Sequence, residues 1–415
     1  MKQHKVELLF PWYSLIYKLD YFLSAYFKYF IHKIIGGNYL NRLSNGKNRI
    51  SLIELEQKIL SNKKKRVALF VAYHKKHEIP LSNKEYLKFL SNCSFSVIYI
   101  HNGKLDEKVI NELEESGCFV ICRKNLGQDF GAWKDLLLLL EKLKLSDYLD
   151  WTLMCNDSNF YLGGENGKIF ERRFLKELEK ENPKDFISLN CNYEMSMHHQ
   201  SYFLCLSNKI LKNKKFIGFW KNYMPLNNRY HAIDNGEKKL SKKILNYYKP
   251  RILLTTYGIY KNLNMQLKDD SLKNIIEILP KNVFHLESCF NESGLDQYTI
   301  QKILHVLDNY NPSHAFAIMY ILYHQSPFLK KDIIRQGTFS PMQIEEFICS
   351  NNMINNDLLK DEIITHCLTD GTPLSFLEDL RLSYRKGICG FGQNYKGYED
   401  SQIYLKKYMT QEKSF

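Results

Sequence analysis

The sequence predicts an α/β protein in which helices flank a mostly parallel sheet. Short apolar runs rich in β-branched and aromatic residues alternate with stretches of helical patterning. That alternation is typical of parallel strands joined by right-handed crossovers. Polar side chains directly follow the apolar runs, where ligands of such sheets bind. The 415 residues, 44% hydrophobic and 25% charged, suit a globular chain of two or three domains and exclude a disordered or collagen-like one.

The expected elements can be placed in chain order. A strand at 66–74 (RVALFVAYH) is apolar almost throughout, which suits burial on both faces of a sheet. It is followed by helical sequence at 83–92, a strand at 95–101, a helix at 106–117 that ends on a glycine, a strand at 118–122, a helix through 136–140 and a strand at 151–154. Beyond Gly163 the pattern loosens, with strands expected at 186–189 and 200–206 and apolar elements at 216–220 and 252–257.

Composition shifts divide the chain into three expected parts. Residues 1–62 form an N-terminal amphipathic helical segment and a polar connector, which leads into a lysine run at 63–65. Residues 63–295 contain the alternating strands and helices. Residues 296–415 are expected to form a helical C-terminal region.

The stretch from Leu8 to Ile35 is the most aromatic in the chain. Lys18, Asp20 and Lys28 interrupt it long before the roughly 20 apolar residues that a bilayer-spanning helix needs. It also lacks the apolar core and cleavage site of a signal peptide. Two interpretations stay open: a helix lying in a membrane interface, or a helix packed on its own domain or on a sister subunit.

Charge and cysteine content narrow the possible partners. The 58 basic and 45 acidic residues give a net charge of +13, which suits nucleic acid, anionic lipid or phosphorylated ligands. The lysines are scattered and no nucleic-acid-binding module is recognisable, so no nucleic-acid partner is expected. The ten cysteines are too scattered for a disulfide framework and are expected to be reduced, as in the cytoplasm.

Polar residues follow four of the expected strands. The candidate ligand-binding residues at these strand ends are Tyr73, His74, His101, Asn102, Arg123, Asn125, Gly127, Asp129, Asn156, Asp157 and Ser158. Since the carboxyl ends of parallel strands lie at one edge of a sheet, these residues should form one site.

Two groups within this set have alternative interpretations. Asp157 at its strand end can bind a divalent cation that bridges a nucleotide diphosphate, but Asn-Asp-Ser can also form a turn that caps the next segment. Arg123 could face a phosphate or a base, Gly127 could let the backbone approach a ligand, and Asp129 could accept from ribose or base. The segment 123–131 could equally be an ordinary turn between a strand and a helix.

The order of several motifs resembles that of a known family. Arg123-x-Asn-x-Gly-x-Asp-Phe-Gly-Ala-Trp133 is followed by Asn156-Asp157-Ser158 and then by His199-Gln-Ser-Tyr-Phe203. This order is similar to the rhamnan synthesis protein F family of bacterial polysaccharide glycosyltransferases. The resemblance runs from about residue 66 to 335. It implies a GT-A-like (Rossmann-like) domain that binds a nucleotide sugar, a cytoplasmic location and work on a surface polysaccharide.

The resemblance also implies roles for individual residues. The donor would be held by the strand-end residues together with His198 and Gln200, and Asp157 would contact a cation, Mg²⁺ or Mn²⁺. A direct displacement needs a carboxylate that takes the proton of the acceptor hydroxyl. The candidates are Glu237, which resembles the family's glutamate before a Leu-Ser pair, and Asp234, with Glu194 as a third. His199 would contact the diphosphate, orient the acceptor or assist proton transfer; the alternative is a histidine pair at a domain seam.

The sequence departs from the GT-A layout at one point. Asn156-Asp157-Ser158 has one carboxylate where the usual Asp-x-Asp motif has two, so metal dependence stays open. The acceptor would be a growing polysaccharide or a lipid-linked glycan, which would give the helix at 8–35 a role at the inner face of the cell membrane. The family name points to rhamnose as the sugar. A non-catalytic scaffold of a polysaccharide assembly complex and, less favoured, a nucleic-acid-binding protein are the alternative functions.

Overall fold

The computed structural model describes residues 56–57, 59–60, 64–194, 196–227, 229–266, 278–280, 297–335, 338–339, 341–349, 354 and 356–369. These residues fall into two compact units. The sheet unit comprises the described parts of 21–157 and 171–253, and the helical unit comprises those of 158–170 and of 254 onward. The boundaries expected after residues 62 and 295 stay predictions, and the stretch at 8–35 lies outside the described residues. Among the described helices, none has the length and apolarity needed to cross a bilayer.

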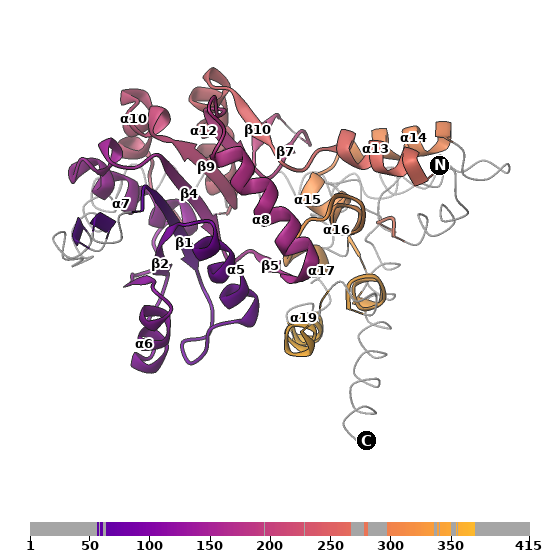
Figure 1. Ribbon diagram of the computed structural model, residues 1–415, viewed down its shortest axis with the longest axis horizontal. Helices are drawn as coiled ribbons and strands as arrows, with labels where there is room; N and C mark the ends of the chain where they lie inside the picture. The colour runs from indigo at the N-terminus through magenta and orange to yellow at the C-terminus, as the bar shows by residue number, and fades with distance from the viewer. Residues whose placement is uncertain are drawn as a thin grey trace, which may run out of the picture. The chain divides into compact units, whose positions relative to one another are not determined.

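The sheet unit is built on seven strands. They are β1 (Arg66–Ala72), β2 (Ser96–His101), β3 (Phe119–Cys122), β4 (Trp151–Asn156), β6 (Phe186–Ser188), β9 (Phe203–Ser207) and β10 (Pro250–Ile252). Their order is β10-β6-β9-β4-β1-β2-β3 (Figure 1). Neighbouring strands pair in parallel except β9, which is antiparallel to both β4 and β6. The predicted mostly parallel sheet is confirmed, and the expected strand at 200–206 is the one that runs the other way.

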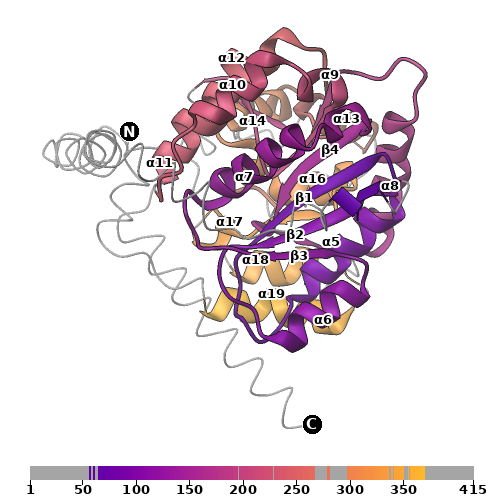
Figure 2. The same ribbon diagram turned by 90° about the vertical axis from the view of Figure 1, so that its left-hand side faces the viewer.

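The helices cover both faces of this sheet. The covering helices are α5 (Leu81–Asn92), α6 (Glu107–Glu115), α7 (Gln128–Lys142), α8 (Gly164–Leu178), α9 (Asn208–Leu211), α10 (Lys214–Asn222) and α12 (Lys239–Lys243). Figure 2 shows α5 and α6 on one face and α7, α10 and α12 on the other. The chain runs outward from β1 to β2 and β3, and α7 then carries it back to β4 on the other side of β1. The point between β1 and β4, where the direction of winding reverses, is where ligands bind in such sheets.

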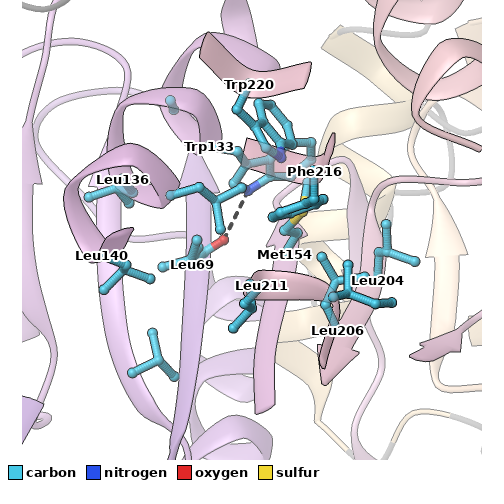
Figure 3. Close-up of a cluster of buried hydrophobic side chains, with 14 of the residues drawn as sticks. Leu69, Trp133, Leu136, Leu140, Met154, Leu204, Leu206, Leu211, Phe216 and Trp220 are labelled. Carbon is cyan, nitrogen blue, oxygen red and sulfur yellow. Dashed lines mark hydrogen bonds between the residues drawn. The ribbon is translucent and has the colours of Figure 1, made fainter. Parts of the chain in front are cut away.

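Alternate residues of β1 pack against the face covered by α7. Leu69 lies in a buried cluster with Met154 of β4, Trp133 of α7 and Trp220 of α10 (Figure 3). The indole N–H of Trp133 donates to the Leu69 carbonyl over 3.1 Å. Because this buried donor has its partner, α7 is fixed to β1 in one rotational position.

The other residues of β1 face α5 and α8. The Phe70 ring lies 5.2 Å from Tyr86 of α5 and stacks on Tyr99 of β2 at 5.3 Å. Phe174 of α8 packs edge-on against Phe203 of β9 at 5.1 Å. Every residue of β1 after Arg66 is buried, which confirms the expectation of a strand covered on both faces.

The helical unit contains a short antiparallel pair and several helices. Its strands β5 (Asn159–Tyr161) and β11 (Phe328–Lys330) pair in antiparallel register. Its helices are α13 (Thr256–Gln266), α14 (Gln297–Asp308), α15 (Pro312–Ala315), α16 (Ala317–His324), α17 (Asp332–Arg335), α18 (Pro341–Ile344), the π-helix η7 (Glu345–Cys349) and α19 (Asp357–Thr369). Phe328 packs edge-on against Tyr161, which joins β11 to β5. The described part of 296–415 is therefore mostly helical.

Candidate functional site

Asp157 lies at the point where the winding of the sheet reverses. The backbone N–H of Tyr73, just after β1, donates to Asp157 Oδ2 over 2.8 Å. The backbone N–H of Asp157, just after β4, donates to the Val71 carbonyl over 3.1 Å. Asp157 Oδ1 accepts no hydrogen bond from the described residues. The carboxylate is therefore fixed across the carboxyl ends of β1 and β4 with one oxygen left for a ligand.

Two histidines and two tyrosines adjoin this carboxylate. His74 Nε2 lies 2.6 Å from the Tyr99 hydroxyl, and the His74 backbone N–H donates to His101 Nε2 over 3.2 Å. The Tyr73 ring is 67% exposed and stacks on His101, with centroids 6.3 Å apart. Burial lowers the pKa of His101, and the nearby His74 lowers it further. The site thus offers a flat aromatic surface beside Asp157.

The Arg123 guanidinium is held by protein groups, and the ligand-binding role expected for it stays a prediction. Its guanidinium donates to Asn102 Oδ1 over 2.6 Å, to the Leu126 carbonyl over 3.0 Å and to Asp135 Oδ2 over 3.1 Å. The side chains of Arg123 and Asp135 are 2% and 9% exposed. Burial lowers the pKa of Arg123, and Asp135 opposes that shift. Arg123 and Asn102 therefore hold the turn between β3 and α7 in place.

We expect Arg123→Met to unfold at lower denaturant concentration, with a loss of about 3–5 kcal/mol, because the buried Asp135 carboxylate would lose the guanidinium with which it forms an ion pair. Urea unfolding measures this loss. Arg66→Met is the matched control, since the Arg66 partner Glu179 is 60% exposed and such pairs contribute about 1 kcal/mol or less. If both variants lose equally little, Arg123 is free of the structural role assigned here.

Gly127 is required by the packing of the chain, and its expected role beside a ligand stays a prediction. Its φ of +75° lies in the left-handed region, and a Cβ there would lie 2.5 Å from Pro225 Cβ. Its N–H donates to Asn227 Oδ1 over 2.5 Å, and Asn227 Nδ2 donates back to the Asn125 carbonyl over 2.8 Å. The close backbone approach predicted from the glycine is thus made by a segment 100 residues away. The Asn125 Oδ1 atom is buried and has no hydrogen-bond partner.

Asp129 connects the end of β4 to the start of α7. Its Oδ2 accepts a hydrogen bond from Asn156 Nδ2 over 2.6 Å. Its position in the first turn of α7 suits a carboxylate, since the helix macrodipole is positive there. Asn156 is the last residue of β4 and precedes Asp157, so Asp129 lies at the same edge of the sheet.

Glu237 is brought to this edge by a π-helix, η3 (Ala232–Lys238). Gly236 lets η3 pack on α7, since a Cβ there would lie 2.7 Å from the Phe130 ring. Glu237 Oε1 accepts from the Ser201 N–H over 3.0 Å and from the Ser201 hydroxyl over 2.5 Å. Its Oε2 lies 3.9 Å from His198 Nε2 and accepts no hydrogen bond from the described residues. One carboxylate oxygen is therefore fixed and the other is left for a proton.

Tyr223 lies within electrostatic range of both Asp129 and Glu237. Burial raises the pKa of the Tyr223 phenol, and the negative charges of Asp129 and Glu237 add to the rise. Both carboxylates therefore act on one hydroxyl. That hydroxyl is buried and has no hydrogen-bond partner.

The other two candidate bases differ from Glu237 in their surroundings. Asp234 on η3 forms an ion pair with Lys238 over 2.7 Å. Glu194 follows the short strand β7 (Cys191–Asn192), and its N–H donates to Asn192 Oδ1 over 2.8 Å. The Oε1 atom of Glu194 is buried and has no hydrogen-bond partner. Glu237 differs from both, since its two carboxylate oxygens lie against Ser201 and His198.

His199 is enclosed by protein groups, and its expected catalytic role stays a prediction. It lies in β8 (His198–His199), is 3% exposed and stands edge-on to Phe186. Its ring Nδ1 lies 2.9 Å from the Ser188 hydroxyl. The backbone N–H of His199 donates to the Ser241 hydroxyl over 2.9 Å. Burial, and then the neighbouring His198, lower its pKa to about 4. At neutral pH this ring is uncharged and enclosed.

These buried histidines should make stability depend on pH. Burial also lowers the pKa of His231 to about 4. An unfolded histidine titrates near 6.5, so between pH 6.5 and 4 the unfolded chain binds more protons and stability falls with falling pH. We expect a loss of up to about 3 kcal/mol per histidine across this window. Urea unfolding at pH 7, 5.5 and 4.5 measures it. His199→Asn should reduce the slope, and an unchanged slope would contradict the assignment.

The remaining predicted residues are placed as follows. Gln200 is buried, and its N–H donates to the carbonyl of Asn190, which follows β6. Ser158 is the first residue of the helical unit, where its hydroxyl accepts from Lys330 over 2.7 Å. Within the described residues no group of three or more His, Cys, Asp and Glu side chains is arranged to hold a metal ion. A cation here would therefore depend on Asp157 and on ligand oxygens.

Several residues of the site were not found from the strand ends. These are Tyr99, Asn190, Ser201, Tyr223 and Asn227. Tyr99 lies inside a strand. Asn190 directly follows the expected strand at 186–189, and Ser201 lies within the expected strand at 200–206, but neither is among the predicted site residues; Tyr223 and Asn227 lie after α10, away from any strand end. Ser201 had a further signal, since it falls inside the His199–Phe203 motif.

Comparisons with known proteins agree with the motif order. The family model described as Rhamnan synthesis protein F matches residues 97–277. The curated uncharacterized protein y4gN of Sinorhizobium fredii (strain NBRC 101917 / NGR234) is 26% identical over 187 residues, 43% of this chain and 47% of the relative. The match thus spans about half the length of that relative. No solved structure matches the chain. The resemblance is confirmed: residues 97–277 match the rhamnan synthesis protein F family, whose description indicates a role in polysaccharide synthesis.

Proposed function

We propose that this chain is a GT-A-like glycosyltransferase that moves a sugar from a nucleotide-sugar donor to a growing cell-surface polysaccharide or lipid-linked glycan. The observation that carries the proposal is that two fixed carboxylates lie at the same edge of the sheet. Asp157 is fixed by Tyr73 where the winding reverses, and Glu237 is fixed by Ser201, which precedes β9; each has one oxygen that accepts no hydrogen bond from the described residues. Rhamnose is the sugar proposed first, because the family's description names rhamnan. A cytoplasmic, membrane-peripheral location is part of the proposal.

The donor would occupy the side of β1 and β2. The exposed Tyr73 ring offers a surface for the base, and Asp157 lies beside it for the diphosphate. A single carboxylate with substrate phosphates suits Mg²⁺, which is seldom held by protein ligands alone. The residues present therefore fit one divalent cation, which would neutralise charge on the leaving nucleotide.

The acceptor would occupy the side of η3 and β8. Glu237 Oε2 would take the proton of the acceptor hydroxyl while the oxygen of that hydroxyl attacks the anomeric carbon of the donor. The bond between the anomeric carbon and the nucleoside diphosphate would break in the same step. The two hydrogen bonds from Ser201 fix the carboxylate plane, so that Glu237 needs little reorganisation before it accepts the proton.

A two-step experiment tests this proposal. Thermal shift across nucleoside diphosphates and nucleotide sugars, with Mg²⁺, with Mn²⁺ and with EDTA, identifies a donor; a ligand at 100 times its Kd stabilises the fold by about 2.7 kcal/mol. Release of nucleoside diphosphate from that donor with a glycan acceptor then measures transfer. Binding followed by release supports the enzyme. Binding without release favours a non-catalytic scaffold, and no binding across the panel contradicts both.

A further inference from the structure

The positive charge of the chain is concentrated in one segment of the sheet unit. Residues 208–251 contain ten Lys and two Arg against two acidic residues, a net charge of +10 out of +13 for the whole chain. Eleven of these cations are exposed. They are Lys209, Lys212, Lys214, Lys215, Lys221, Arg229, Lys239, Lys242, Lys243, Lys249 and Arg251, and we call them the basic face. The remaining 371 residues have a net charge of +3. Acidic side chains from outside the segment form ion pairs with four cations of the face, namely Lys209, Lys212, Lys221 and Arg251.

The basic face is carried by helices on one side of the sheet. Lys214, Lys215 and Lys221 lie on α10, and Lys242 and Lys243 lie on α12. Figure 1 and Figure 2 both show α10 and α12 close together on the outer side of the unit. Among the described residues, no acidic side chain forms an ion pair with Lys214, Lys242, Lys243 or Lys249. Their charge is therefore available to a partner.

One exposed and one half-buried tyrosine lie among these lysines. Tyr247 is 76% exposed, and the Lys215 ammonium lies 5.6 Å from the centre of its ring. The Lys209 ammonium lies 5.7 Å from the ring of Tyr248, and Asn213 donates to the Tyr248 hydroxyl over 2.6 Å. These contacts join α9 and α10 to the segment before β10. They form a single surface that combines ammonium groups with amphipathic rings.

We propose that the basic face binds the anionic phospholipid headgroups of a membrane. Lysine ammonium groups bind headgroup phosphates without a fixed geometry, and tyrosine rings lie at the level of the headgroups. A nucleic-acid surface would favour arginine, whose planar fork matches phosphate and base edges, and lysines outnumber arginines ten to two here. The proposal is independent of sugar transfer and of residues 8–35.

The α9 part of the basic face lies away from Asp157. Lys209 of α9 lies two residues after β9, and the end of β9 pairs with the beginning of β4 through Ser207 and Trp151. Asp157 follows the other end of β4. Lys209 and Asp157 therefore lie at opposite ends of the sheet, so contact with a bilayer through α9 does not cover Asp157.

Co-sedimentation of the full chain with vesicles tests the proposal. The variant replaces Lys214, Lys242, Lys243 and Lys249 with Gln, and the matched control replaces Lys88, Lys104, Lys108 and Lys176, which are exposed on the α5, α6 and α8 side. Each lysine should contribute about fivefold to the partition coefficient on vesicles with 40% phosphatidylserine. We therefore expect the variant to bind about a hundredfold or more weakly, the control to bind within about threefold of wild type, and binding to fall with added salt.

Three results would overturn the proposal. The variant could pellet as well as wild type, the control could lose as much binding as the variant, or phosphatidylcholine vesicles could bind the protein equally well. A single-stranded oligonucleotide added at equal phosphate concentration is a further arm. If it displaces the protein from vesicles completely, the face is a nucleic-acid surface instead. Thermal unfolding of both variants shows that the fold is retained, and release of nucleotide from a donor is measured separately.

Discussion

Replacement of Glu237 by Gln should lower sugar transfer by about 10²–10⁴-fold while the affinity for donor is unchanged. Gln keeps an oxygen that accepts from Ser201 but has no carboxylate to take the acceptor proton. The measurement is the rate of nucleoside diphosphate release at saturating donor and acceptor, with donor affinity from calorimetry. A variant that loses the donor instead would place Glu237 on the donor side.

Asp234→Asn is the matched control for this substitution. Asp234 lies on the same π-helix, three residues earlier, and its carboxylate is paired with Lys238. It should transfer sugar within about threefold of wild type, since surface ion pairs contribute about 1 kcal/mol or less. If Asp234→Asn is the slower of the two variants, the roles of the two carboxylates are reversed.

Replacement of Asp157 by Asn should reduce transfer by at least about a hundredfold and weaken donor binding. Asn keeps an oxygen that accepts from the Tyr73 N–H and removes the charge proposed to act on the diphosphate. Stability should change by less than about 1 kcal/mol, which separates a ligand role from a turn-capping role. Asp150→Asn, just before the amino end of β4, is the matched control and should transfer normally. Normal transfer by Asp157→Asn would leave Asp157 with the capping role alone.

The sheet could be predicted because its strands are continuous apolar runs. Val67 and Phe70 are buried on opposite faces of β1, so both kinds of position had to be apolar, and that pattern is visible in the sequence. The direction of β9 could not be predicted. A strand buried on both faces has the same pattern whether its neighbours are parallel or antiparallel, and Phe203–Ser207 is such a strand.

The edge of the sheet that holds the candidate site was also predictable. The polar residues after β1 and β4 meet there, as the contact between Tyr73 and Asp157 shows. The partners of Arg123 and Gly127 were not predictable. A cation or a glycine at a strand end has the same sequence signal whether it meets a phosphate or the chain itself, and Gly127 meets Pro225 through tertiary packing.

The choice among the carboxylates needed the structure as well. Asp234 and Glu237 are close in sequence, and either could have been the base. The π-helix joins Glu237 to Ser201 and leaves Asp234 paired with Lys238. A π-helix has no strong sequence signal, because its extra residue per turn is stabilised by tertiary contacts such as Gly236 on Phe130.

The mass of the acceptor after incubation with a donor tests the central claim most directly. Wild-type protein, the donor found by thermal shift and a glycan acceptor should give an acceptor heavier by one sugar residue, with one nucleoside diphosphate released for each sugar added. Glu237→Gln should give the same product at a rate lower by about 10²–10⁴-fold. An acceptor of unchanged mass, from a protein that binds the donor and remains folded, would contradict the assignment of glycosyltransferase activity.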